Sequence, residues 1–374
     1  MTQRILYLVT EDWYFLSHRL PMARAAQAAG YEIHVATRLT RDRDAIAREG
    51  FVPHALSWNR GSVSPFGSIA AIREIRRLLR EIRPAILHNV ALKPVLLGSA
   101  ASLGLSMIAV VNSLTGVGTL FIGEARVSAL ARRTVRFGLS RLLRRRRSKV
   151  VVQNPDDHAF VLDLGVPAEN IVVIPGSGVD TASLTPLAEP PPPITAAYVG
   201  RMLADKGVLT LIEAYSSLHA RGVSLQLLLA GGCDKENPGS LSPEQLREFA
   251  GALGIHWLGH VVDIKEVWAK AHFAVLASRR EGLPKSLLEA AACGRAMVAT
   301  DAPGCREIAI EGETALTVPV DDAAALANAL ARLAGDAALR EKFAKRAREL
   351  VEEKFSADAI GRQTVQLYET LRAS

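Results

Sequence analysis

The chain has 374 residues, 49% hydrophobic and 22% charged, so it is long enough for about two globular domains and has no composition typical of disorder or of a fibrous repeat. Its three cysteines lack zinc or redox spacing, which is typical of a reducing compartment and not of a disulfide framework. The apolar run after Met1 is too short for a signal peptide, so we expect a cytoplasmic protein.

The first half of the chain alternates short apolar runs with helix-length segments, a pattern that predicts a parallel sheet. The uncharged stretch 95–112 approaches the length of a membrane span, but its glycines and serines favour a buried helix followed by a strand. The runs suited to buried strands are Ile5–Val9, Ile33–Ala36, Ala85–His88, Met107–Val111, Val150–Val152 and Ile171–Ile174.

The positive charge of the chain is concentrated in one segment. The formal net charge is +7, and Arg126–Lys149 alone holds ten Lys or Arg and no acid. Apolar residues recur there at helical spacing, which predicts a basic amphipathic helix suited to anionic lipid head groups. A solvated helix flank is the alternative, and nucleic acid is disfavoured because the segment has almost no aromatic residues to stack on bases. We expect peripheral association with the inner face of the cell membrane.

Consecutive prolines interrupt the pattern at residues 185–194, where they remove backbone donors and favour extended chain. We expect this segment to link an N-terminal domain, residues 1–184, to a second doubly wound domain, residues 195–355. Residues 356–374 are expected to form a helix that packs back on the N-terminal domain. Strand-like runs of the second half are Ala196–Val199, Leu225–Ala230, His256–Leu258, Phe273–Leu276, Met297–Ala299 and Ala315–Val318.

The strongest motif follows the run Phe273–Leu276 and extends from Ser278 to Glu289. Pro284 suits the first turn of a helix, and Gly282 lets the preceding turn approach a ligand. Ligands of open α/β sheets bind at the carboxyl ends of strands, and helix N-termini favour phosphate oxygens. Glu281 and Glu289 are therefore expected to bracket a site and to accept hydrogen bonds from sugar hydroxyls. The alternative is a surface acid and a residue that supports a helix terminus.

A second motif follows the run Ala196–Val199. Gly200 ends the strand, and Arg201 and Lys206 flank the turn into the next helix. Two cations at this edge of the sheet would neutralise a departing diphosphate without a metal. Surface cations on a loop are the alternative.

Together these motifs resemble the retaining glycosyltransferases of family 4. Gly200-Arg201 with Lys206-Gly207 is followed by Glu281 and Glu289, eight positions apart. Segments 9–21, 116–118, 175–180 and 231–238 look like the branch that builds lipid-linked oligosaccharides and surface polysaccharides. The likeness covers essentially the whole chain. It implies an α/β protein of two facing Rossmann-like, doubly wound domains, the GT-B fold, with an interdomain cleft.

The resemblance also implies roles for individual residues. Arg201 and Lys206 would bind the donor diphosphate, Glu281 the donor-sugar hydroxyls, and Glu289 the nucleotide ribose. Backbone amides of residues 282–286 would assist at the phosphates, and the base would lie near Val261. The donor-binding set is Gly200, Gly282, Leu283, Pro284, Lys285, Ser286, Glu289 and Val261, beside the catalytic candidates Arg201, Lys206, Glu281 and His88.

The first half is expected to bind the acceptor. Arg19 is placed to meet a phosphate or the acceptor, and Gly116 and Gly118 make a loop able to approach the cleft. His88 follows the apolar residues 85–87, and His18 is similarly placed after the first strand. Both are candidates to face the reacting sugar, although a lone histidine is more often structural.

The expected reaction is transfer of a sugar from a UDP-sugar, with an N-acetylhexosamine as one candidate, to a polyprenyl-diphosphate-linked glycan. The family implies a front-face mechanism in which the leaving phosphate helps to deprotonate the acceptor. We expect no metal and no other cofactor, since the sequence has no acidic metal triplet and no glycosidase-type carboxylate pair. A soluble acceptor, a nucleotide-sugar epimerase and a non-catalytic membrane-associated binding protein are the alternatives.

Overall fold

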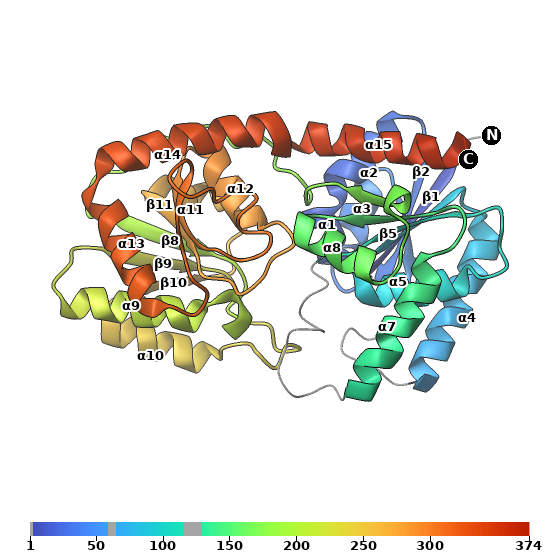
Figure 1. Cartoon of the computed structure of the whole chain (residues 1–374), viewed down its shortest axis with the longest axis horizontal. Coiled ribbons are helices and arrows are strands. Elements are labelled where there is room, and N and C mark those ends of the chain that lie inside the picture. The colour runs from blue at the N-terminus through green and yellow to red at the C-terminus, as the bar shows by residue number, and fades with distance from the viewer. Residues whose placement is uncertain (1–2, 59–64, 116–128, 374) are drawn as a thin grey trace. The chain divides into compact units, whose positions relative to one another are not determined.

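The computed structural model describes residues 3–58, 65–115 and 129–373. The chain divides into two compact units, Met1–Ser177 with Ala357–Ser374 (unit 1) and Gly178–Ser356 (unit 2). Each described unit is a parallel sheet with helices packed against it (Figure 1). The chain thus leaves unit 1 after Ser177 and returns to it with its last helix.

The sheet of unit 1 has the order β3-β2-β1-β4-β5-β6-β7 in the described residues, and every pairing is parallel. Its strands are β1 (Arg4–Glu11), β2 (Glu32–Arg38), β3 (Val52–Ala55), β4 (Ile86–Val90), β5 (Ala109–Ser113), β6 (Ser148–Val152) and β7 (Ile171–Val173). Its helices are α1 (Asp12–His18), α2 (Leu20–Ala28), α3 (Arg43–Arg48), α4 (Pro65–Ile82), α5 (Leu92–Ala101), α7 (Ala129–Leu143), α8 (Pro155–Asp163) and α15 (Ala357–Ala373).

Unit 2 repeats this architecture with the order β10-β9-β8-β11-β12-β13, again parallel in every pairing described. Its strands are β8 (Thr195–Val199), β9 (Gln226–Ala230), β10 (His256–Gly259), β11 (Phe273–Leu276), β12 (Ala296–Thr300) and β13 (Ala315–Val318). Its helices are α9 (Val208–Ala220), α10 (Pro243–Leu253), α11 (Ile264–Lys270), α12 (Lys285–Ala292), α13 (Ala323–Gly335) and α14 (Ala337–Leu350).

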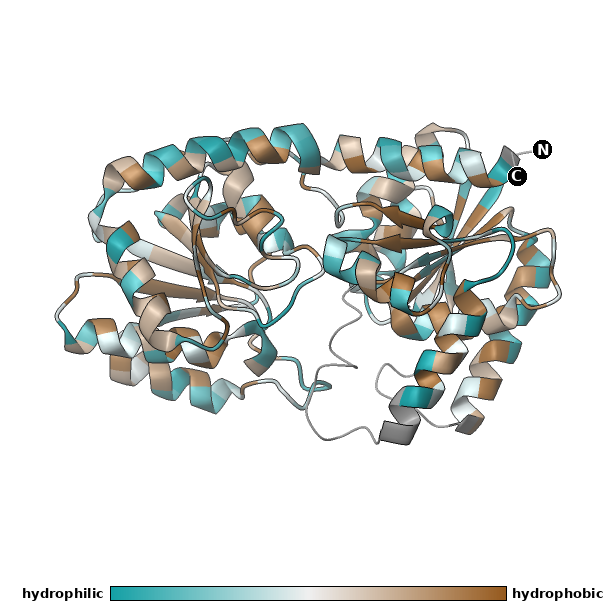
Figure 2. Cartoon of the chain, in the orientation of Figure 1, coloured by the Kyte–Doolittle hydropathy of each residue, from teal (hydrophilic) through white to brown (hydrophobic). Residues whose placement is uncertain are grey.

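The central strands are buried on both faces, as expected when helices cover both sides of a parallel sheet. Every residue of β4, β5, β11 and β12 is buried. Figure 2 shows hydrophobic residues concentrated on the strands, whereas hydrophilic and hydrophobic residues alternate along the helices. Strand β3 is the element that periodicity did not predict, because this short edge strand contains Pro53 and has no fully buried residue.

The last helix, α15, packs against α2 of unit 1 (Figure 1). Gly361 allows this close packing, since a Cβ there would lie 2.8 Å from the Cβ of Ala25. Tyr368 is fully buried, and its hydroxyl lies 2.7 Å from the hydroxyl of Tyr7 on β1. The two ends of the chain therefore share one core.

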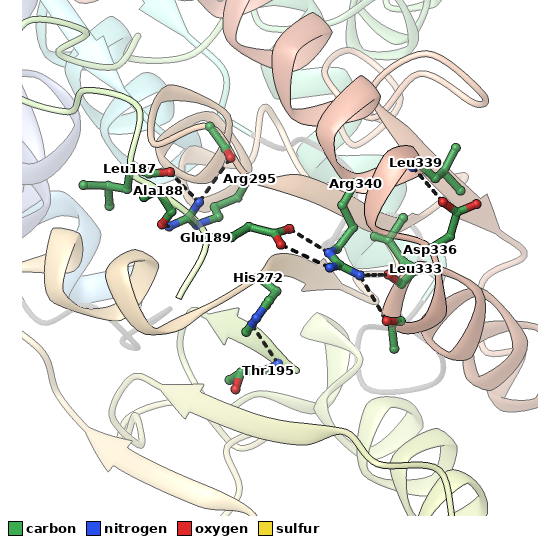
Figure 3. Close-up of polar contacts among 12 residues, drawn as sticks. Leu187, Ala188, Glu189, Thr195, His272, Arg295, Leu333, Asp336, Leu339 and Arg340 are labelled. Atoms are coloured by element: carbon green, nitrogen blue, oxygen red, sulfur yellow. Dashed lines mark hydrogen bonds and ion pairs between the residues drawn. The ribbon is translucent and has the colours of Figure 1, made fainter. Parts of the chain in front are cut away.

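The proline-rich segment 185–194, expected to be a linker, packs along unit 2. The guanidinium of Arg295, only 1% exposed, donates to the carbonyl oxygens of Leu187 and Ala188, both at 2.8 Å. Arg340 binds the Glu189 carboxylate through Nε at 2.7 Å and Nη2 at 3.1 Å (Figure 3). Two buried arginines thus fasten residues 187–189, directly before the prolines, whose nitrogens cannot donate.

Candidate functional site

Loops after three neighbouring strands of unit 2 meet through ion pairs. Arg201 lies after β8, and its Nη1 is 2.7 Å from Oδ2 of Asp234, which follows β9. Lys206, on the same loop as Arg201, has its Nζ 2.6 Å from Oε2 of Glu281, which follows β11. The carboxyl ends of parallel strands share one edge of the sheet, so these contacts bring Arg201, Lys206 and Glu281 to one edge of unit 2.

Two glycines allow these loops to approach one another. Gly207 has a φ of +70°, and a side chain there would collide with the carbonyl group of Ala277. Gly231 has a φ of +148°, and a Cβ would collide with the carbonyl oxygen of Gly200. Both positions require glycine because of positive φ and the nearby backbone together.

Glu281 is held in place by both of its carboxylate oxygens. Ser278 Oγ donates to Oε1 at 2.7 Å, and Lys206 binds Oε2. The backbone N–H of Glu281 donates to the carbonyl of Pro303 at 2.9 Å. The side chain of Lys206 is 22% exposed and that of Glu281 13% exposed, so a ligand that reaches this pair meets an oriented cation and an oriented carboxylate.

Helix α12 begins at Lys285, with Pro284 as its N-cap residue. Pro284, expected in the first turn, thus stands one residue before it. The N–H of Leu287 donates to the carbonyl of Pro284 at 3.1 Å, whereas those of Lys285 and Ser286 have no described acceptor, which makes this end suited to an anion. Burial raises the pKa of the Glu289 carboxyl, against the opposing effect of Lys285, whose Nζ lies 3.3 Å from Oε1. Leu283 is 9% exposed and packs in the core of unit 2, so its contribution to a site is limited to its backbone.

Val261, expected near the base, follows β10 and is partly buried against the core of unit 2. The loop lies beside the glycines after β9, because a Cβ at Gly232 would be 4.0 Å from the Cβ of His260. Trp257 on β10 donates from Nε1 to the carbonyl of Gly231 at 2.9 Å. The segments around Val261 and Gly231 therefore belong to the same edge of the sheet as Arg201.

Three residues at this edge were not predicted from the sequence. Tyr198 is fully buried and donates its hydroxyl to the carbonyl of Arg201 at 2.8 Å, while Asp234 and Trp257 anchor neighbouring loops. Burial, and secondarily the charge of Glu281, raise the pKa of Tyr198 well above its ordinary value, so its phenol stays protonated as a donor. Asp234 does follow the glycine pair 231–232 at a strand end, which is the one signal that could have indicated it.

In unit 1, His18 and Arg19 lie where α1 ends and α2 begins. The His18 ring stacks on Tyr14 with centroids 4.3 Å apart, and its Nδ1 is 2.6 Å from Ser17 Oγ. Arg19 is only 2% exposed. Gly116 and Gly118 lie outside the described residues.

His88 lies within β4 and not after it, and both of its ring nitrogens have partners. Nδ1 is 2.5 Å from the hydroxyl of Tyr368, and Nε2 is 2.7 Å from Oγ of Ser113. Burial, with a smaller contribution from the charge of Arg19, lowers the pKa of His88 well below its ordinary value. A neutral imidazole held from both sides is suited to orient Ser113 at the end of β5.

The predicted basic helix is α7, which ends at Leu143, before the arginine run 144–147. Phe137 is 65% exposed on it. Several cations of the segment are engaged in the fold: Arg136 pairs with Asp163 at 2.6 Å, and Arg145 donates to Ser102 Oγ at 2.7 Å and to the Ser99 carbonyl at 3.1 Å. Within the described parts of the chain, no helix has the length and apolar character needed to cross a membrane.

Two sequence models of families match the chain. The model described as "Glycosyl transferase 4-like" matches residues 4–154, and that described as "Glycosyl transferases group 1" matches residues 193–336. The second match contains Arg201, Lys206, Glu281 and Glu289.

Among curated proteins, the chain is similar to an N,N'-diacetylbacillosaminyl-diphospho-undecaprenol alpha-1,3-N-acetylgalactosaminyltransferase of Campylobacter jejuni. The two are 26% identical over 355 residues, which cover 89% of this chain and 92% of that protein. A match of 28% identity to the capsular polysaccharide biosynthesis glycosyltransferase CapM of Staphylococcus aureus covers 46% of this chain and 45% of that one.

Solved structures share the fold along the whole chain. A glycosyltransferase of Rickettsia africae superposes with a TM-score of 0.81 at 19% identity and covers 99% of this chain and 98% of its own. Anabaena Alr3699/HepE in complex with UDP and glucose gives a TM-score of 0.79 at 18% identity, with 98% of this chain and 100% of that chain covered. At these identities the likeness establishes the fold alone.

Proposed function

This chain belongs to the group 1 glycosyltransferases, the family 4 enzymes with the GT-B fold, and we propose that it transfers a sugar from a UDP-sugar to a polyprenyl-diphosphate-linked glycan. The observation that carries the donor side is the Arg201, Lys206 and Glu281 cluster at the carboxyl edge of the unit 2 sheet. The Campylobacter relative is named for transfer of N-acetylgalactosamine to an undecaprenol-diphosphate-linked sugar, and the Anabaena structure is described as containing UDP.

The cluster suits a nucleoside diphosphate leaving group. Arg201 and Lys206 present two cations at the edge of the sheet where α12 begins, and charged hydrogen bonds to phosphate contribute about 1.5–3 kcal/mol each. A diphosphate that enters would exchange the Lys206–Glu281 contact for a Lys206–phosphate contact. The Glu281 carboxylate, still bound by Ser278, would then be available to sugar hydroxyls.

We propose that transfer retains the anomeric configuration by reaction on one face of the sugar. The bond from the anomeric carbon to the β-phosphate oxygen breaks, and the acceptor oxygen forms its bond to that carbon on the same face. The acceptor proton passes to the departing phosphate oxygen. Arg201 and Lys206 stabilise the charge that develops on the diphosphate, which is the transition-state contribution this mechanism requires of the protein.

The test is transfer into lipid. Purified protein is supplied with UDP-N-acetylgalactosamine, UDP-N-acetylglucosamine, UDP-glucose or GDP-mannose and with a polyprenyl-diphosphate-linked glycan, with and without a chelator. We expect chelator-resistant label in the lipid fraction from one UDP-sugar. Transfer from GDP-mannose alone, or transfer only to a glycan without its lipid diphosphate, would contradict the proposal.

We also propose that α7 holds the protein on an anionic membrane surface. The cations suited to this role are exposed and are not among those that bind α5 or α8: Arg133, Arg141, Arg144 and Arg146. Their replacement by glutamine should reduce co-sedimentation with anionic vesicles, whereas replacement of the exposed Lys270, Arg332, Lys342 and Lys345 of unit 2 should not. Equal vesicle binding by both variants would leave α7 as a solvated helix.

A further inference from the structure

Arg19 is a buried cation of unit 1 without an anionic partner among the described residues. The residue is only 2% exposed. Nη1 makes a single contact, to the sulfur of Met22 at 3.3 Å, and Nε has no hydrogen-bond partner within the described chain. A buried guanidinium that meets only a weak acceptor is costly, because desolvation of a charge must be offset by an opposite charge or by hydrogen bonds.

Other buried arginines show how this chain normally satisfies such a group. Arg295, 1% exposed, donates to the carbonyls of Trp268, Leu187 and Ala188 at 2.8–2.9 Å. Arg340, 4% exposed, binds the Glu189 carboxylate and the carbonyls of Leu333 and Ala334 (Figure 3). Arg19 differs from both because the described protein supplies neither a carboxylate nor a carbonyl to its side chain. Among the described residues, its guanidinium therefore has none of the partners that Arg295 and Arg340 have.

Arg19 lines a narrow, partly open pocket at the carboxyl edge of the unit 1 sheet. The polar side chains around the pocket are His88, Ser113, Gln153 and Thr364, and its remaining wall is mostly apolar. Ser113 ends β5 and Gln153 follows β6, so the pocket lies where ligands of parallel sheets bind. No carboxylate is among the residues that line it.

His88 adds to the pocket without adding charge. Its two nitrogens are engaged by Tyr368 and Ser113, so the ring fixes the Ser113 hydroxyl. Among the described residues that line the pocket, Arg19 therefore carries the positive charge. One cation with neutral hydroxyl and amide groups is the chemistry that binds phosphate oxygens.

We propose that this pocket binds a phosphate group, with Arg19 as its charge partner and Ser113 and Gln153 as hydrogen-bonding partners. The identification of that group as a phosphate of the acceptor's lipid diphosphate rests on the proposed function. The site would place the acceptor through unit 1, while the donor diphosphate is bound by Arg201 and Lys206 of unit 2. Phosphate recognition would then be divided between the two units.

The test is anion-dependent stability and affinity, which needs no turnover. Arg19→Met replaces the guanidinium with a side chain that suits the apolar wall, and Arg24→Met is the control, since Arg24 is an exposed cation of the neighbouring helix turn whose Nε lies 2.6 Å from Glu49. Both changes are also made in a Lys206→Met protein, so that the unit 2 cations contribute less to the signal. The probes are inorganic pyrophosphate, geranyl diphosphate and UDP, measured by thermal unfolding and calorimetric titration.

In the Lys206→Met background, we expect pyrophosphate and geranyl diphosphate to raise the Tm of the protein with Arg19 intact and of the Arg24→Met variant, and to raise that of the Arg19→Met variant much less. Their Kd should rise at least about tenfold in Arg19→Met, as for the loss of one charged hydrogen bond. Without anion, Arg19→Met should be at least as stable as wild type, because it removes an unpaired buried charge.

The probes distinguish the sources of the phosphate. If Arg19→Met weakens the binding of geranyl diphosphate and leaves the affinity for UDP unchanged, the bound phosphate is that of the acceptor. If Arg19→Met weakens the binding of UDP, the site binds a phosphate of the donor. Unchanged pyrophosphate affinity in Arg19→Met, or a Tm lower than that of Arg24→Met with no response to any anion in wild type, would overturn the proposal. Anion binding that depends on Arg19 in a protein without transferase activity would instead reject the proposed function and leave this site standing.

Discussion

Replacement of Arg201 by alanine should separate catalysis from folding. The Arg201 side chain is 40% exposed, and the one ion pair described for it is with Asp234, at 2.7 Å. A pair at this exposure stabilises the fold by about 0–1 kcal/mol, so the variant should fold. In the proposed reaction the same guanidinium faces the charge that develops on the departing diphosphate. Loss of such a donor lowers kcat by about a hundredfold, or about 2.7 kcal/mol.

Arg306→Ala is the matched control. Arg306 is also a partly exposed arginine of unit 2, 46% exposed at its side chain and 2.9 Å from Asp301. The two variants should unfold at similar urea concentrations, whereas only Arg201→Ala should lose activity. The assay is the rate of nucleoside diphosphate release with saturating donor, together with kcat and KM for each variant.

The division between kcat and KM carries the interpretation. An interaction made mainly in the transition state lowers kcat, whereas one made equally with bound donor raises KM and leaves kcat unchanged. A folded Arg201→Ala protein with near-normal kcat would refute the assignment of Arg201 to the leaving group. A fall of similar size in Arg306→Ala would refute the specificity of the effect.

Two further predictions concern the backbone of unit 2 and the buried histidine of unit 1. Gly207→Ala and Gly222→Ala both place alanine at a φ of +70°, which costs about 1–2 kcal/mol. Of these two positions, only 207 faces a backbone carbonyl, so Gly207→Ala should lower the free energy of unfolding in urea by at least about 1–3 kcal/mol more than Gly222→Ala. Equal losses in the two variants would contradict the described turn. The pKa of His88 is lower in the folded protein than in the unfolded chain, so the unfolded state binds the extra proton and stability falls as pH drops below about 6.5, by up to about 1.4 kcal/mol per pH unit from this residue. His88→Gln should remove that share of the pH dependence between unfolding at pH 7.5 and pH 5.5, and an unchanged pH dependence would show that folding does not lower the pKa of His88.

The meeting of Arg201, Lys206 and Glu281 at one edge of the sheet could be predicted from the sequence because its signals are local. Arg201, Lys206 and Glu281 each follow an apolar run that becomes a buried strand, and parallel strands bring their carboxyl ends to one edge. The sequence does not show which charged residues pair. Lys206 pairs with Glu281 and Arg201 pairs with Asp234 because of the way three loops pack against one another. Tyr198 escaped notice because it reads as an ordinary strand residue, although its hydroxyl supports the Arg201 backbone.

In unit 1 the chemistry depends on residues far apart in the chain. His88 has partners 25 positions away, Ser113, and 280 positions away, Tyr368, and no local pattern indicates either contact. The same holds for the segment that contains the prolines 190–193, which local composition indicates as a linker. The cations that fasten this segment, Arg295 and Arg340, lie more than a hundred residues later, so no local pattern indicates them. Sequence periodicity reports which residues are buried within an element, but not which buried polar groups meet.

Arg19 shows how this gap between local pattern and tertiary contact can be used. Its position after β1 and α1 makes it a candidate to bind a phosphate, but any arginine near the end of a strand would be an equal candidate. Burial without a partner gives the stronger argument, because an exposed arginine needs none and the buried Arg295 and Arg340 have theirs. A buried cation that the described protein leaves incomplete, in a pocket without a carboxylate, is an observation that the residue's place in the sequence could not supply. For this reason the binding of an anion, and not the rate of sugar transfer, is the quantity to measure at this site.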